Sequence, residues 1–166
     1  MSGRAAALAA ALLVAWCVAA SAASVCAAGL GLASPQDAAL VAFARQAGLR
    51  FPEAFRNLAD FLHADGGRAL PDCYLTKRRA DALGWRPGRD LWEVAPGASI
   101  GGDRFENREG RLPRRWNGRY VEADLDYAGG HRGTHRLVFV RMMGDAWLFF
   151  VSTDHEASFR EFVPSR

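Results

Sequence analysis

The apolar residues of this chain change their spacing near its midpoint. In the first half they recur at helical intervals i, i+3, i+4 and i+7, as in the series Phe55, Leu58, Ala59 and Leu62. In the second half they form short runs separated by turn signals such as Gly129-Gly130. This change predicts a single α+β domain in which N-terminal helices pack on one face of a C-terminal antiparallel β-sheet.

Local signals place the ends of the first two helices. Ser34 and Pro35 suit the capping position and the first helical position of one helix, and Gly48 follows its last apolar residue. A second helix begins near Pro52 and stops at Gly66-Gly67. Both helices therefore precede the strand-like half of the chain.

Shorter elements follow. Thr76 can cap a third helix over residues 77–83, and Leu91 begins a short helical turn that ends at residue 94. A hairpin turn is expected at residues 142–145. The predicted strands cover residues 98–100, 120–126, 136–141, 146–151 and 158–162.

Residues 1–22 have the pattern of a secretory signal peptide. Arg4 is their only charge, residues 5–20 are apolar, and Ala20-Ser21-Ala22 offers small residues for cleavage. The apolar run is short for a bilayer span of about 20 residues, although an uncleaved anchor is the alternative. We therefore expect secretion without stable membrane association, an N-terminal extension with one helix over residues 23–51, and a functional domain over residues 52–166.

The cysteines and the net charge restrict the kinds of ligand that this chain is expected to bind. Of the three cysteines among 166 residues, Cys26 and Cys73 remain after signal removal, either as a disulfide in an oxidising compartment or as two free thiols. No Cys or His lies at metal-ligand spacing from either one, so we expect no metal and no cofactor. The net charge of +3 agrees with a polyanionic partner.

Polar residues on and near the predicted strands suggest a chemical site. If neighbouring strands pair, Glu122, Arg132 and Arg136 can share one sheet face, while His155 ends an apolar strand and Lys77 begins a helix. A carboxylate and an imidazole can act as base and acid on the two sides of a phosphate, and the cations can neutralise its developing charge. Taken singly, each residue is also explained by a structural ion pair or a solvated surface.

The segment 99–110 is a second candidate. It joins Gly101-Gly102 to alternating acids and arginines, so it can present N–H groups, a guanidinium and a carboxylate to one small polar ligand. Asp103 and Asp124 are interpreted as structural supports that anchor turns or pair with nearby arginines.

Six motifs then occur in a fixed order along the chain. They are Leu70-Pro71-Asp72-Cys73-Tyr74-Leu75-Thr76-Lys77, Ala82-Leu83-Gly84-Trp85, Val94-Ala95-Pro96-Gly97-Ala98-Ser99-Ile100-Gly101-Gly102-Asp103, Asn107-Arg108-Glu109-Gly110-Arg111-Leu112-Pro113, Glu122-Ala123-Asp124 and Thr153-Asp154-His155. This series closely resembles the barnase-like secreted bacterial guanyl-preferring ribonucleases, within the microbial ribonuclease N1/T1 family. The resemblance is strong over residues 70–162, faint across the helix at Pro52 and absent before it.

The resemblance implies the microbial ribonuclease fold for residues 52–166 and a metal-independent endoribonuclease. Glu122 matches the general base and His155 the general acid, while Lys77, Arg132 and Arg136 match the groups that hold the scissile phosphate. Single-stranded RNA would be cut after guanosine to a 2′,3′-cyclic phosphate, which is then hydrolysed. The family also implies a small acidic barstar-like inhibitor protein, and we expect the chain to be a monomer.

The same resemblance assigns base recognition to the loop. Glu109 would accept the guanine N1 and N2 protons, and Arg108 would lie beside the base and phosphate sites. The backbone from Glu106 through Asn107 to Arg108 would face the guanine O6, with Phe105 supporting or stacking on the base.

Two positions depart from the family's pattern. Glu156 stands where an aromatic residue is common, and a carboxylate there would repel phosphate. His131, a further substrate-binding candidate, stands where Phe is common. These departures leave open the alternative of a catalytically weakened RNA- or protein-binding module of the same fold. A separate alternative is a ribonuclease toxin that acts on other cells.

Overall fold

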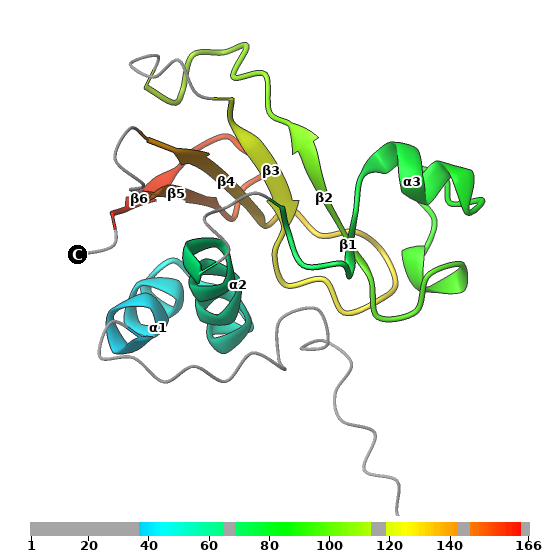
Figure 1. The fold of residues 1–166 in the computed structure, drawn as a ribbon, viewed down its shortest axis with the longest axis horizontal. Coiled ribbons are helices and arrows are strands. Elements are labelled where there is room, and N and C mark those ends of the chain that lie inside the picture. Colours follow the sequence, from blue (N-terminus) through cyan, green and yellow to red (C-terminus); the bar gives the residue numbers. More distant parts are fainter. Residues whose placement is uncertain (1–36, 65–68, 114–118, 143–146, 164–166) are drawn as a thin grey trace, which may run out of the picture.

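The computed structural model describes residues 37–64, 69–113, 119–142 and 147–163. Helices precede a six-stranded sheet, which confirms the predicted α+β class (Figure 1). The elements are α1 (Asp37–Gln46), α2 (Pro52–Ala64), β1 (Tyr74–Leu75), α3 (Lys77–Ala82), a 3-10 turn (Leu91–Glu93), β2 (Ser99–Arg104), β3 (Val121–Asp124), β4 (Arg136–Arg141), β5 (Trp147–Ser152) and β6 (Arg160–Phe162). The predicted signal peptide, the cap at Ser34-Pro35, Gly66-Gly67 and most of the predicted hairpin turn lie outside the described residues.

The two long helices form where their apolar spacing predicts them. Four α2 residues predicted to share one face are buried: Phe55, Leu58, Ala59 and Leu62. Gly48 adopts a φ of +84° just after α1, and the N–H of Leu49 donates to Ala44 O. Such a left-handed residue after a helix satisfies its last carbonyls and is most easily supplied by glycine.

A distant carboxylate holds the beginning of α2. Asp126, just after β3, accepts hydrogen bonds from the N–H groups of Arg50 (2.7 Å) and Phe51 (2.9 Å). The same carboxylate lies 2.7 Å from Nδ1 of His135, which directly precedes β4. Asp126 therefore ties the helical layer to the loop that joins β3 and β4.

The strands follow each other across the sheet in the order β1-β2-β3-β4-β5-β6. Pairs from β2 to β6 are antiparallel, as predicted, and β4 pairs with β5 over six residues. The short strand β1 was not predicted, and it runs parallel to β2. Two residues are too few to show an alternating pattern, so only the tertiary pairing reveals this strand.

The sheet has two different faces. One packs against α1 and α2, as Figure 1 shows, in a cluster that includes Ala44, Leu58, Leu137 and Phe149. The helix of the 23–51 extension therefore shares its core with the rest of the chain. The opposite face carries an apolar cluster around Val138 and, further along the same strands, the polar residues described below.

A bulge in β2 lies next to Asp103, whose carboxylate contacts the start of α3. The β2–β3 register shifts between Gly101 and Asp103, and Gly102 at this point has a φ of +92°. An added Cβ on Gly101 would lie 2.7 Å from the Tyr74 ring, so glycine permits the close packing of β1 on β2.

Cys73 is disulfide-bonded, and the partner suggested by the sequence, Cys26, lies outside the described residues. Across the four described ranges, no helix combines the length and apolar character needed to cross a membrane.

Candidate active site

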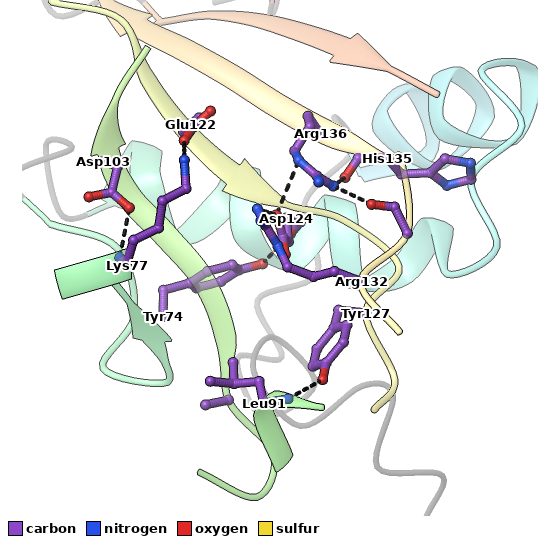
Figure 2. A network of polar contacts seen from close by, with 12 residues as sticks. Tyr74, Lys77, Leu91, Asp103, Glu122, Asp124, Tyr127, Arg132, His135 and Arg136 are labelled. Atoms are coloured by element: carbon purple, nitrogen blue, oxygen red, sulfur yellow. Dashed lines mark hydrogen bonds and ion pairs between the residues drawn. The ribbon is translucent and has the colours of Figure 1, made fainter. Parts of the chain in front are cut away.

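Lys77 and Glu122 form an ion pair between α3 and β3. Nζ of Lys77 lies 2.5 Å from Oε1 of Glu122, whose side chain is only 12 % exposed (Figure 2). Thr76 caps α3 by accepting from the Arg79 N–H, and Asp103 accepts from the Lys77 N–H at 2.8 Å. The bulged strand and the helix cap thus hold the lysine beside the carboxylate.

Asp124 binds two arginines on the same sheet face as Glu122. Its oxygens accept hydrogen bonds from Nε and Nη2 of Arg132, at 2.5 and 2.6 Å. Nε of Arg136 lies 3.3 Å from Oδ1 of Asp124, directly opposite it in the β3–β4 register. Successive side chains of a strand alternate between faces, so Glu122 and Asp124 lie on one side of β3. The predicted sharing of a face by Glu122, Arg132 and Arg136 is therefore what the structure shows.

Burial and the Asp124 charge act in opposite directions on these guanidinium groups. Burial lowers the pKa of Arg132, but the hydrogen bonds and charge of Asp124, together with the charges of Glu122 and Glu156, raise it above the usual value. For Arg136 burial dominates and lowers the pKa despite the attraction of Asp124. Arginine titrates so far above neutrality that both groups keep their charge. The buried Asp124 carboxylate thus lies beside two positively charged guanidinium groups.

A network of serines and one aspartate builds the turn after β5. Asp154 accepts hydrogen bonds from the Ser158 N–H, the Ser158 hydroxyl and the Ser152 hydroxyl. The hydrogen bonds from the Ser158 side chain and backbone, and from Ser152, lower the pKa of Asp154 to about 2. Glu156 N–H donates to Ser152 Oγ at 2.8 Å, which closes the turn.

This turn carries His155 at the molecular surface. His155 and Glu156 adopt φ angles of +60° and +66°, which are uncommon for residues other than glycine. The N–H of His155 donates to Thr134 O in the loop before β4, so the exposed imidazole is anchored through its backbone. Within the described part of the chain, no hydrogen bond to its ring restricts the imidazole.

Glu156 brings a third carboxylate to the cluster. Burial and the charge of Glu122 raise the pKa of Glu156, while the charges of Arg136, His155 and Lys77 oppose that rise. Ser152 lies opposite Arg136 in the β4–β5 register and the His155 N–H donates to Thr134 O, so the turn lies beside the end of β4 that bears Arg136. Glu156 makes no ion pair with any described side chain, so its charge is not neutralised by a direct partner.

The loop after β2 is closed by its own asparagine. The side-chain amide of Asn107 donates to Leu112 O at 2.8 Å, and its oxygen accepts from the Leu112 N–H at 3.0 Å. Asn107 also has a φ of +43°, and the Gly110 N–H donates to its carbonyl. Because its side chain closes the loop, Asn107 can offer a ligand mainly its backbone.

The remaining residues of this loop differ in exposure. Arg108 and Glu109 are exposed, Glu106 pairs with Arg104 at 3.4 Å, and the half-buried Phe105 ring packs edge-on against Phe159. The loop and the His155 turn are joined by Arg111, whose Nη1 donates to Glu156 O at 2.7 Å.

The structure thus brings most of the predicted catalytic residues together. Lys77, Glu122, Arg132 and Arg136 are linked by contacts or charge, and the His155 turn lies beside them. His131 is exposed, and no hydrogen bond or ion pair joins it to another described residue. Three supporting residues were not predicted as site residues: Ser152, Asp154 and Arg111. Arg111 bonds a backbone atom 45 positions away, which no local pattern indicates. Ser152 and Asp154 bond groups two to four positions away, so the turn-forming tendency of Ser and Asp is the signal that could have identified them.

This arrangement can move protons beside a bound anion. Glu122 offers a carboxylate at the edge of solvent, His155 an exposed imidazole, and the Arg132–Arg136 pair a fixed positive region. No group of three or more His, Cys, Asp or Glu side chains suited to a metal ion occurs among the residues that the structure describes.

Comparisons of this sequence with a family model and with known proteins both give matches to ribonucleases. A family model described as ribonuclease matches residues 60–163. The chain is 47 % identical over 106 residues to a ribonuclease of Heyndrickxia coagulans, in a match that covers 63 % of this chain and 92 % of that protein. Ribonucleases of Bacillus intermedius and Bacillus pumilus show the same identity over 106 residues, which covers 62 % of their length.

Proposed function

This chain belongs to the ribonuclease family and is an endoribonuclease, and from that premise we propose that it cuts single-stranded RNA after guanosine without a metal ion. One observation carries the proposal: Glu122 and the Asp124-bound arginines share a sheet face beside the turn that bears His155. A carboxylate, an imidazole and fixed cations around one anion are the groups that phosphodiester transesterification requires.

In the proposed reaction the nucleophile belongs to the substrate. Glu122 takes the proton of the ribose 2′-OH, whose oxygen attacks the adjacent phosphorus and forms a 2′,3′-cyclic phosphate. His155, as imidazolium, protonates the departing 5′-oxygen, and the P–O5′ bond breaks. Water then opens the cyclic phosphate with the two roles exchanged, and a 3′-phosphate remains. Lys77, Arg132 and Arg136 stabilise the negative charge that develops on the phosphorus oxygens.

Guanine recognition is assigned to the loop after β2. The exposed Glu109 carboxylate would accept the N1 and N2 protons of guanine, and backbone N–H groups from Glu106 to Arg108 would bind its O6. The internal hydrogen bonds of Asn107 support this role because they hold the loop backbone in one shape before the base arrives.

Digestion of a defined RNA that contains one guanosine tests the proposed reaction. In excess chelator we expect a single cut, with a guanosine 2′,3′-cyclic phosphate on one fragment and a 5′-hydroxyl on the other. End-group analysis by mass spectrometry identifies both. Dependence on added metal, or cutting with no regard to guanosine, would contradict the proposal. Folded protein that binds guanosine 3′-phosphate without cleaving RNA would support the alternative of a binding module.

Replacing Glu156 with Gln is expected to tighten phosphate binding at neutral pH. With Glu156 ionised, its charge offsets the excess positive charge of Asp124 and its two arginines. The E156Q variant should bind guanosine 3′-phosphate about threefold more tightly at pH 8, as expected for one partly solvated charge worth under about 1 kcal/mol. Titration calorimetry measures the affinity.

The pH dependence of the affinity difference between E156Q and wild type provides a second test of this prediction. The pKa of Glu156 is raised, so its carboxylate becomes neutral on acidification before an unperturbed Glu does, and the two proteins should converge toward pH 4. Glu161→Gln makes the same charge change at an exposed position of β6 and should leave the affinity unchanged. Equal affinities of E156Q and wild type at pH 8 would contradict the prediction.

Export, oligomeric state and inhibition belong to the same proposal. We propose a secreted monomer, released by cleavage after residues 1–22, whose basic site a small acidic barstar-like protein would cover before export. The excess of arginine around the site supports the charge of that partner.

A further inference from the structure

Arg111 bridges two parts of the site that have different tasks. Its Nη1 donates to the main-chain oxygen of Glu156 at 2.7 Å, across 45 positions of sequence. The same nitrogen lies 3.5 Å from Oε2 of Glu109, the carboxylate assigned to guanine. One N–H-bearing atom is therefore placed between the base-reading loop and the turn that carries His155.

That turn depends on contacts made from outside it. His155 and Glu156 both occupy the left-handed region, which is unfavourable for residues other than glycine and persists only where surrounding contacts hold it. Ser152 and Asp154 hold the turn from within, and Thr134 O accepts the His155 N–H on one side. Arg111 binds the carbonyl directly after His155 from the other side.

We propose that Arg111 is a positioning residue that couples guanine recognition at Glu109 to the placement of His155. The coupling rests on the proposed function. When guanine binds to the Glu109 carboxylate, the carboxylate has less negative charge to offer Arg111, and the guanidinium is committed to Glu156 O. Without guanine, Glu109 competes for the guanidinium and the acid turn is held less firmly. Guanine thereby raises kcat as well as affinity.

A second contact joins the same two segments but does not involve the Glu109 carboxylate. The Phe105 and Phe159 rings meet edge-on with their centroids 5.9 Å apart. This apolar contact holds the loop near the turn but involves neither the Glu109 carboxylate nor the backbone beside His155. Of these two described contacts, the Arg111 contact is the one that includes the carboxylate assigned to guanine.

Steady-state kinetics on two dinucleotides test the coupling. For guanylyl-(3′→5′)-uridine, R111A should lower kcat about tenfold with KM changed less than about twofold, whereas adenylyl-(3′→5′)-uridine should lose far less kcat. R111K should recover part of the loss, because an ammonium can still donate to the carbonyl. Arg104→Ala removes an arginine that pairs with Glu106 beside the same loop, and should leave both kcat values unchanged.

A double-mutant cycle with Glu109→Ala distinguishes coupling from simple support. In the E109A background, R111A should have little further effect on the ratio of the two kcat values, because the carboxylate that senses guanine is gone. Equal kcat losses on both dinucleotides, or a change in KM alone, would overturn the proposal for Arg111. Loss of guanosine preference in the wild-type digestion would instead overturn the proposed function.

Discussion

Replacing Glu122 with Gln is expected to lower kcat for RNA transesterification by about 10²–10⁴-fold. Gln keeps the size of the side chain but cannot accept the 2′-OH proton. The side chain is almost buried, and its oxygen contacts Lys77 at 2.5 Å, so the amide can occupy the same place. The loss should therefore fall on kcat, with a smaller change in KM. Stopped-time assays on a guanosine dinucleotide measure both.

Glu53→Gln is the matched control for this prediction. Glu53 lies at the exposed start of α2 and pairs only with Arg45 among the described ion pairs, on the opposite side of the sheet from Glu122. It should retain wild-type kcat. Circular dichroism and thermal unfolding of both variants separate a chemical loss from a folding defect. Near-normal cleavage by folded E122Q would remove Glu122 from the role of base.

The second large effect concerns stability. Asp124→Asn should lower the free energy of unfolding by about 3 kcal/mol, because removing one partner leaves buried charges uncompensated. The Asp124 side chain is 2 % exposed, and it binds Arg132 through two hydrogen bonds and Arg136 through an ion pair. An amide offers one acceptor where two guanidinium groups now share a charged carboxylate. Urea denaturation followed by fluorescence measures the change.

An exposed Asp–Arg ion pair provides the control for this stability prediction. Asp81 and Arg86 are in contact at 2.5 Å, but both side chains are more than 60 % exposed. Asp81→Asn should change the free energy of unfolding by less than about 1 kcal/mol. If D124N loses no more stability than D81N, the Asp124 pair contributes no more than a surface contact, and our view of the buried cluster is wrong.

Local patterns were enough to predict most of the fold. The apolar spacing from Phe55 to Leu62 predicts α2 because its burial follows the period of a single helix. The strand β4 has the predicted bounds, 136–141, since a continuous apolar run between polar residues is a local property. By contrast, β2 extends to Arg104, beyond the predicted strand, because its second half is polar and is extended by pairing with β3.

The candidate site could likewise be predicted from the sequence only in part. Glu122 and Arg136 could be placed on one face from strand alternation and pairing alone, whereas Arg132 lies in the loop between β3 and β4 and reaches this face through its hydrogen bonds to Asp124. The sequence did not reveal that Arg111 reaches Glu156 O, or that Asp126 accepts a hydrogen bond from the N–H of Arg50, 76 positions earlier and just before α2. Those contacts depend on which backbone atoms the folded chain brings within hydrogen-bond distance, and no local pattern encodes them.

The sequence by itself determined the α+β class, most of the helices and strands, and the family. These properties depend on side-chain chemistry and on spacing along the chain. Only the tertiary structure decided that Asp124 binds two arginines, that Glu156 interacts with the charges of Glu122 and Arg136, and that Arg111 joins the loop after β2 to the turn that carries His155. The physical reason is distance: electrostatic and hydrogen-bond energies depend on separation in space, which the fold sets.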